Sequence, residues 1–332
     1  MVTRALNRPW INAQEHPFLG LQAFHLVDFR AMLVSVLIAT RERPEALRRC
    51  VASVARQTYA DLELLVWDDA STPPVQEALV RNEAGRHPAR CFRSDERLGP
   101  MGCRNGLMQH ARGEVFIVLD DDACLADAEA ITQVVRAFEA YPRAGILAFK
   151  IVERCQGKER MLVPHRRRRV HRDPRLIEQE GLVSHYLAGG HALRRRVIEQ
   201  VGYFHEGLYY GHEELDLSYR TLDAGFEIRY LPRVLVYHLP ETEASRIDPW
   251  KLYYSIRNRL LTVYRYLPWR YVPTHVGFWL FLYGWQALRQ TALGAYGRGV
   301  WAGLAATRRF HRHPIKPETV AYLKAHGGRL WY

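Results

Sequence analysis

Short apolar runs alternate with segments of helical periodicity from residue 33 to residue 238. The apolar runs are rich in β-branched residues, which is typical of strands buried on both faces of a sheet. Strands are predicted at 33–39, 63–67, 89–93, 115–119, 145–151 and 234–238, and helices are predicted to begin near residues 44, 75, 102, 128, 195 and 213. This alternation predicts an α/β fold with a Rossmann-like, doubly wound, mostly parallel sheet.

Polar side chains follow three of the predicted strands directly. Thr40 follows the first strand, residues 68–69 follow the second, and the aspartates 120–122 follow the strand 115–119. In such sheets ligands bind where the carboxyl ends of the strands meet. Adjacent carboxylates repel one another, and Asp120 and Asp122 point to the same side of an extended chain, so both can hold one hard divalent metal. The three aspartates alone would also fit a solvated turn, but the convergence of the strand ends favours a metal site.

The two ends of the chain differ from this central part. Residues 1–31 show no clear periodicity and are predicted to form an N-terminal extension, which is either a docking arm or a segment upstream of a start at Met32. We expect the catalytic domain at 32–245 and a helical C-terminal region at 246–332. The most apolar run of that region, 276–285, is far shorter than the ~20 residues of a membrane-spanning helix.

Tryptophans and arginines interleave in the C-terminal region, at Trp269, Trp279, Trp285 and Trp301 and at Arg265, Arg270, Arg289 and Arg298. This pattern suits association with a membrane interface, and it equally fits a helical hairpin packed on the catalytic domain. The segment 154–181 is strongly basic, and its run Arg166 to Arg169 indicates either a solvated loop or a binding element.

Composition adds a formal net charge of +12, which indicates anionic partners such as nucleic acid, an acidic membrane surface or a phosphorylated substrate. The five cysteines are scattered without a CxxC spacing, which is typical of reduced thiols in a cytoplasmic protein. The first 32 residues lack the apolar core of a secretory signal. We therefore expect a cytoplasmic protein, with peripheral attachment to the inner face of the plasma membrane as one possibility.

Between Leu33 and His238 the chain carries an ordered set of motifs: VSVLIATRERPEALRRCVASVARQT, ELLVWDDAST, GPMGCRNGLMQHARGEVFIVLDDDA, GGHALRRRVIEQVGYF and HEELDLSYR. Each motif alone is a weak signal, but the ordered set is specific. Through it the chain resembles the family 2 glycosyltransferases of the GT-A fold, which include enzymes of bacterial cell-envelope polysaccharide synthesis. The resemblance implies a nucleotide-diphosphate sugar as donor and Mg²⁺ or Mn²⁺ as cofactor.

The resemblance also implies roles for individual residues. The nucleotide-sugar would be held by Ala39, Thr40, Arg41, Glu42, Asp69, Arg104, Asn105, Asp120, Asp121, Gly189 and Gly190. The metal would be held by Asp122 and Asp120 of a DxD-type motif and by His238. Glu214 takes the position of the catalytic base, where the family has the aspartate of a Glu-Asp pair. The first loop, 39–42, departs from the family's Pro-Thr-Tyr-Asn series, which leaves the identity of the nucleotide base open.

The function implied is that of an inverting, metal-dependent glycosyltransferase that acts on a hydroxyl of an envelope or exported glycan or of a lipid-linked acceptor. A nucleotidyltransferase of related fold would be expected to carry a glycine-rich, lysine-bearing signature after the first strand, and 40–44 offers none. A nucleic-acid-binding function is suggested by charge alone, without a recognised module, so nucleic acid is not an expected partner. An inactive sugar-binding relative is disfavoured because the metal and base positions are acidic.

Overall fold

The computed structural model describes residues 32–240 and 248–331. The predicted N-terminal extension, 1–31, lies outside the described residues. From Met32 onward the chain forms one compact unit, which includes both the predicted catalytic part and the C-terminal helices.

A ten-stranded mixed sheet forms the centre of this unit. Its order is β3 (Ala89–Ser94), β2 (Leu62–Asp69), β1 (Val34–Thr40), β4 (Val115–Asp120), β9 (Gly190–Arg194), β6 (Ala144–Cys155), β10 (Glu227–His238) and β5 (Ala123–Leu125), with β7 (Lys158–Leu162) on β6 and β8 (Gly181–Leu182) on β10. The first four strands are parallel, as are β6 and β10, whereas β9 runs antiparallel between β4 and β6. The predicted α/β fold is confirmed, with antiparallel strands added to the second half of the sheet.

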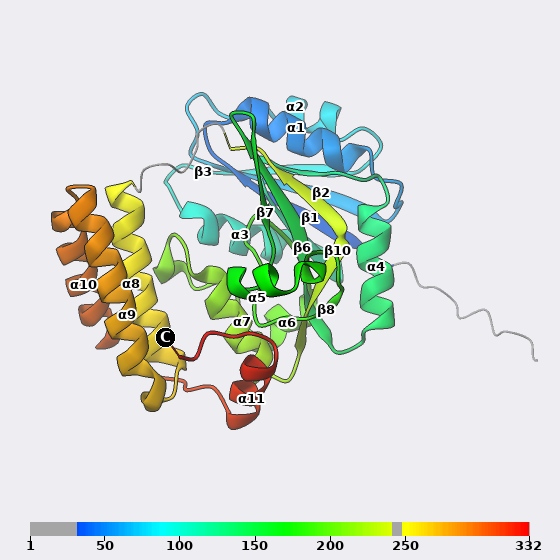
Figure 1. The fold of residues 1–332 in the computed structure, drawn as a ribbon. Coiled ribbons are helices and arrows are strands. Elements are labelled where there is room, and N and C mark those ends of the chain that lie inside the picture. Colours follow the sequence, from blue (N-terminus) through cyan, green and yellow to red (C-terminus); the bar gives the residue numbers. More distant parts are fainter. Residues whose placement is uncertain (1–31, 241–247, 332) are drawn as a thin grey trace, which may run out of the picture. The chain divides into compact units, whose positions relative to one another are not determined.

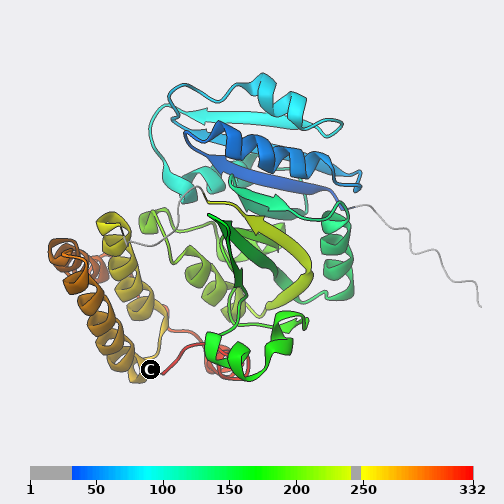
Figure 2. The same cartoon turned by 45° about the horizontal axis from the view of Figure 1, so that its top comes forward.

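Helices cover both faces of the sheet (Figures 1 and 2). On one face lie α1 (Pro44–Ala55), α2 (Glu77–Glu83) and α4 (Ala130–Ala140), and on the other lie α3 (Gly99–His110), α6 (Arg195–Val201) and α7 (Glu213–Asp223). Consecutive residues of β1 explain the two layers: Val36 and Ile38 pack into the first core and Leu37 into the second, all without exposed surface. Successive side chains of a strand alternate between faces, so a continuous apolar run supplies both cores.

The C-terminal helices are α8 (Pro249–Tyr266), α9 (Val272–Arg289), α10 (Leu293–Thr307) and α11 (Pro317–Ala325). Val263 and Tyr266 of α8 belong to the same core as Leu217 of α7, so α8 is attached to the helix at the predicted base position. α9 and α10 pack against α8 (Figure 1). Among the described helices, none has the length and apolar character that crossing a bilayer requires.

The basic segment 154–181, for which the sequence left a solvated loop and a binding element open, contains regular structure. It contains the end of β6, the strand β7, the helix α5 (Arg167–Arg172), a 3₁₀ turn at Pro174–Ile177 and β8. β6 and β7 form an antiparallel hairpin in which Arg154 and Glu159 form an ion pair of 2.6 Å. β7 is almost entirely exposed, so its sequence has no apolar periodicity and the strand is specified by pairing with β6.

Candidate active site

The carboxyl ends of the parallel strands meet at one edge of the sheet, as predicted. In register, Ala39 of β1 pairs with Asp120 of β4, and Thr40 pairs with Asp68 of β2. A cavity of about 670 Å³ opens at this edge. Of the predicted site residues, it is lined by Ala39, Thr40, Arg41, Asp69, Arg104, Asp120, Asp121, Asp122, Glu214 and His238. Ala39 and His238, 199 positions apart in the chain, therefore share one cavity large enough for a complete small-molecule ligand, for which ~300–1,000 Å³ is usual.

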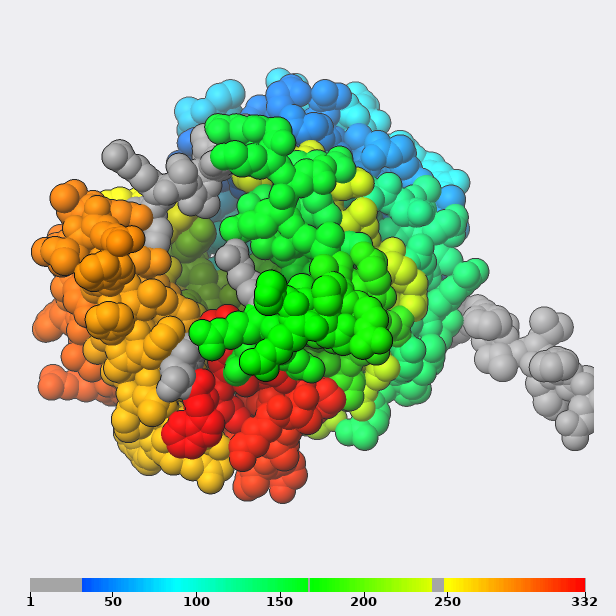
Figure 3. Space-filling model, in the orientation of Figure 1, coloured from blue at the N-terminus to red at the C-terminus, as the bar shows by residue number. Residues whose placement is uncertain are grey.

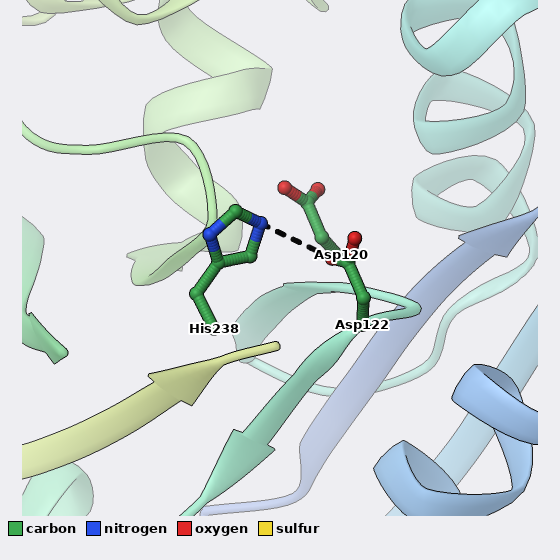
Figure 4. A group of neighbouring side chains, drawn as sticks. All are labelled: Asp120, Asp122 and His238. Atoms are coloured by element: carbon green, nitrogen blue, oxygen red, sulfur yellow. Dashed lines mark ion pairs between the residues drawn. The ribbon is translucent and has the colours of Figure 1, made fainter. Parts of the chain in front are cut away.

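Asp120, Asp122 and His238 form a group that could hold a metal ion (Figure 4). One ligand atom from each lies within 4.8 Å of the others. β5 pairs with β10 in a register that places His238 opposite Ala123, directly after the aspartates. Asp122 is buried, and its Oδ1 lies 3.3 Å from His238 Nε2. Two carboxylates and an imidazole are a donor set that suits Mn²⁺ or Mg²⁺.

Charge around the group favours a charged carboxylate at Asp122. Burial would raise the pKa of Asp122, but its hydrogen bond to His238 and the charges of His238 and Arg43 leave that pKa lowered. For His238, burial would lower the pKa, but Asp122 and other carboxylates raise it overall. The imidazole also lies 3.3 Å from Glu153 through Nδ1, which leaves Nε2 directed at Asp122.

Arg43 is a site residue that the sequence analysis missed. Its guanidinium contacts Asp121 Oδ1 at 2.5 Å and Asp122 Oδ2 at 2.6 Å, while Thr40 donates to the other oxygen of Asp121 at 2.7 Å. Burial raises the pKa of Asp121 to about 7, against the opposing charge of Arg43. The position of Arg43, between the end of β1 and the start of α1, was the signal available, because that loop faces the strand ends.

Arg104 connects the aspartates with the N-terminus of α7. It is buried in α3 and donates to Asp120 at 2.6 Å and to Glu213 at 3.2 Å. Burial would lower its pKa, but Asp120 and Glu213 raise it, so the guanidinium stays charged. Glu213 is therefore neutralised by Arg104 through Oε1.

Glu214 follows Glu213 on α7 and lines two cavities, the main one and a smaller one behind the helix. Burial and the adjacent charge of Glu213 raise the pKa of Glu214 to about 8. Neighbouring side chains on a helix diverge by about 100°, which explains why only Glu213 reaches Arg104. A carboxyl group whose pKa is near neutrality can accept a proton from a substrate hydroxyl.

Four predicted donor-binding residues do not line the main cavity. The amide of Asn105 donates to Phe204 O at 2.9 Å and accepts from Phe204 N at 3.0 Å, so it joins α3 to the segment after α6. Glu42 pairs with Arg41 at 2.9 Å. A Cβ at Gly190 would lie 3.0 Å from Val236, and one at Gly189 would lie 3.7 Å from Asp120 Oδ2.

Asp69 lines the cavity and also shapes it. Its carboxylate accepts from the backbone amides of Leu98 at 2.7 Å and Gly99 at 3.1 Å. Gly99 has a φ of 75°, a backbone conformation that favours glycine, and it begins α3. Asp69 therefore holds the bend from which α3 carries Arg104 into the site.

The sequence analysis also missed the contribution of the segment before α7 and of the start of α8. Tyr209, Tyr210 and Trp250 line the main cavity. Asn258, fully buried in α8, donates to the carbonyls of Leu208 at 2.8 Å, Tyr210 at 2.8 Å and Gly211 at 3.1 Å. The aromatic residues ahead of the Glu-Glu pair were the only signal in the sequence for this wall.

Comparison with known proteins identifies the family. Residues 35–202, half of the chain, match the family model described as Glycosyl transferase family 2. The chain therefore belongs to glycosyl transferase family 2, as the ordered motifs predicted.

Two curated relatives show how much of the chain is shared. An uncharacterized protein of Sinorhizobium fredii, y4gI, is 30% identical over 61% of this chain and 22% of its own length. The O-antigen biosynthesis protein RfbC of Myxococcus xanthus is 29% identical over 65% of this chain and 16% of its own length. The chain thus matches only a small part of these relatives.

Two solved structures show the same fold. The mannosyltransferase PcManGT of Pyrobaculum calidifontis, solved with GDP-Man and Mn²⁺, has a TM-score of 0.53 and 19% identity, covering 89% of this chain and 79% of that one. Residues 1–349 of S. aureus TarS give a TM-score of 0.53 and 16% identity, covering 70% of this chain and 65% of that one. The predicted GT-A fold is confirmed.

Proposed function

We propose that this chain transfers a sugar, with inversion, from a nucleotide-diphosphate sugar to a hydroxyl of an envelope glycan or a lipid-linked acceptor. One observation carries the proposal. The group of Asp120, Asp122 and His238 and the carboxyl group of Glu214 line the same cavity of about 670 Å³. A glycosyl transfer needs a cation at the leaving diphosphate and a base at the acceptor hydroxyl, and the cavity offers residues for both.

The donor is proposed to bind across the strand ends. Mg²⁺ or Mn²⁺ held by Asp120, Asp122 and His238 would neutralise the negative charge that develops on the leaving diphosphate. Arg41 and Arg43 line the same side of the cavity and supply further positive charge there. Asp121, which Thr40 and Arg43 hold in place, is proposed to lie near the ribose.

Glu214 is proposed to accept the proton of the acceptor hydroxyl. Glu213 is paired with Arg104, so Glu214 is the member of the pair that remains available for the reaction. Direct attack by the hydroxyl on the anomeric carbon, opposite the leaving diphosphate, inverts the configuration of that carbon. The base and the diphosphate must then lie on opposite sides of the sugar, and the proposal assigns Glu214 of α7 to the base and the aspartates at the strand ends to the diphosphate.

The acceptor class is proposed from the relatives. A Campylobacter jejuni relative is named GalNAc(5)-diNAcBac-PP-undecaprenol beta-1,3-glucosyltransferase and is 28% identical over 32% of this chain and 35% of its own length. RfbC is named for O-antigen biosynthesis. Such acceptors are attached to lipid, so we place this chain at the cytoplasmic face of the membrane, with α9 and α10 at the lipid surface.

The proposal is tested with a panel of nucleotide-sugars, by measuring hydrolysis and nucleotide affinity with Mn²⁺, with Mg²⁺ and with EDTA. We expect one donor to be hydrolysed only when metal is present. Asp122→Ala should abolish the metal-dependent part of nucleotide affinity, as measured by calorimetry, while the circular dichroism of the fold is kept. Equal affinity with and without metal in both proteins would contradict the metal site. If the chain instead forms a sugar nucleotide from a nucleoside triphosphate and a sugar phosphate, its activity is nucleotidyl transfer and the proposed glycosyl transfer is contradicted.

A further inference from the structure

A second cavity of about 210 Å³ lies behind α7. It is enclosed by α7, α8, residues 165–166 and 184–185, and the segment 327–329 that follows α11. Figure 3 shows, on one face of the molecule, the orange helix α9, the green segment around α5 and the red C-terminal segment below them. The volume is below the ~300–1,000 Å³ of a pocket for a whole ligand, so this cavity suits one chemical group of a larger molecule.

The lining of this cavity, here called the basic cavity, is positively charged. Arg166, Arg259 and Arg329 line it, and Glu214 is the one carboxylate among its lining residues. Burial and the nearby arginines lower the pKa of His185 to about 4 and that of His275 to about 4, so both imidazoles are neutral. Three guanidinium groups against one carboxylate leave an excess of positive charge that suits a dianion.

Arg259 is the arginine of the basic cavity that is available to bind a ligand. It forms no hydrogen bond or ion pair with residues 32–240 or 248–331, and its guanidinium lies over the ring of Trp279 at 4.1 Å. Thr262, one turn further along α8, is 4% exposed, and its hydroxyl has no hydrogen-bond partner within the described part of the chain. A guanidinium and a buried hydroxyl on one wall are unsatisfied donors that an oxyanion would complete.

We propose that the basic cavity binds a phosphate or diphosphate group of the acceptor. This proposal rests on the proposed function, because it takes Glu214 as the base. Glu214 lines both cavities, so a group held in the basic cavity places the attached sugar hydroxyl at the carboxyl group. Arginine binds phosphate oxygens in a bidentate manner. The basic cavity thus selects acceptors that carry a phosphate near the hydroxyl that reacts.

Binding of inorganic pyrophosphate tests the site without any catalysis. Equilibrium dialysis is carried out in EDTA, which removes the metal that would let pyrophosphate bind at Asp120 and Asp122. We expect Arg259→Gln to lower the affinity about tenfold or more, and Thr262→Val to lower it less. Arg143→Gln is the matched control, because Arg143 is 76% exposed, pairs with Glu227 and lies outside the cavity, and it should leave the affinity unchanged. Absence of pyrophosphate binding in the wild-type chain, or equal affinity in Arg259→Gln with its fold intact, would overturn the proposal.

Kinetics separate this proposal from the proposed function. Arg259→Gln should raise the acceptor KM about tenfold for phosphorylated acceptors, with the KM for the donor unchanged. A polyprenyl diphosphate acceptor in vesicles and a soluble glycosyl phosphate distinguish the two sources of the phosphate group. A lower kcat at unchanged acceptor KM would mean that Arg259 acts only on Glu214, which would contradict the site. If no donor is transferred or hydrolysed by any variant, the proposed function fails while the dialysis result still decides the phosphate site.

Discussion

Arg104 gives the two adjacent glutamates different environments. Its guanidinium joins Asp120 to Glu213, and the contact with Glu213 is buried. Glu214 lines both cavities, and burial and the adjacent charge of Glu213 raise its pKa to about 8. Arg104 of α3 therefore forms an ion pair with Glu213 and leaves Glu214 without one among the described residues.

Changing each glutamate to glutamine should have a different effect: one variant should lose turnover and the other should lose stability. A general base contributes typically ~10²–10⁴-fold to a rate, so Glu214→Gln should lower turnover by about that factor and leave donor affinity nearly intact. Glu213→Gln weakens the contact with Arg104 and should lower the free energy of unfolding by roughly 1–3 kcal/mol. Transfer rate, nucleotide affinity and urea unfolding are measured for both variants. If Glu213→Gln loses transfer while affinity and stability are preserved, the base is Glu213 and the assignment of Glu214 is wrong.

The raised pKa of Glu214 also predicts how stability depends on pH. Its folded-state pKa of about 8 lies above the ordinary value of 4.5, so the folded chain holds this proton more tightly than the unfolded chain does. The resulting contribution to stability is complete below pH 4.5 and is lost as the pH rises through about 8. Glu214→Gln lacks this loss, so its stability relative to wild type should increase from pH 6 to pH 9. Urea unfolding at both pH values measures the difference, and a constant difference would contradict the raised pKa.

At the scale of elements, the strands that position the site could be predicted because they are buried. β1 and β4 are largely apolar runs that end in polar residues, and both features are visible in the sequence. β7 and α5 could not be predicted, because their residues are polar and their structure depends on pairing with β6 and on contacts from distant segments. Burial leaves a pattern in the sequence, whereas pairing of an exposed edge strand does not.

The same distinction applies to the site. Asp120, Asp122 and His238 could be placed because a motif and strand ends specify them. Arg43 and Asn258 could not, because their roles depend on distances between side chains of separate elements. Asn105 matches the family motif but its amide is used to join α3 to Phe204. A motif predicts which residue type is present, and only packing determines where its polar atoms point.

Asn258 makes the position of α7 depend on α8. The segment it holds has a positive φ at Tyr209, Gly211 and His212, a conformation that residues other than glycine adopt at a cost of about 1–3 kcal/mol each. Asn258→Ala removes the donor to three carbonyls in this segment, so we expect a several-fold lower kcat and faster amide exchange at 209–212. Asn82→Ala, at an exposed position on α2, is the control and should change neither. If amide exchange at 209–212 and kcat in Asn258→Ala equal those of the wild-type chain, the segment keeps its conformation without these hydrogen bonds from α8.

At the scale of the whole molecule, α9 and α10 each expose an apolar stripe. On α9 it consists of Phe278, Phe281, Trp285 and Leu288, and on α10 of Leu293, Trp301 and Leu304. At 100° per residue each set spans about 80° of the helix surface. The helices pack on α8 and still leave apolar faces exposed, so association with a membrane interface stays a prediction. Arg289 lies over the ring of Trp285 at 4.8 Å, which places a cation beside the α9 stripe.

Exposed apolar faces together with a net charge of +12 lead to a prediction about membranes. We expect the chain to float with vesicles that contain anionic lipid, and to float less with neutral vesicles or at high salt, since each basic residue near the surface contributes roughly 1 kcal/mol. Phe281 and Trp301 are 73% and 74% exposed. Insertion of each should contribute about 1.5–3 kcal/mol, so changing both to serine should lower partitioning by roughly a hundredfold or more.

Tyr203→Ser is the control for this prediction, because Tyr203 is 42% exposed but lies next to α6, outside both stripes. Its flotation should match that of the wild-type chain. The double variant should keep its nucleotide affinity, because neither Phe281 nor Trp301 lines the main cavity. Flotation that is unchanged in the double variant would exclude the stripes as the membrane contact. Absence of flotation in the wild-type chain with anionic vesicles would instead indicate that the stripes bind another protein surface, since the apolar area they expose favours burial in either case.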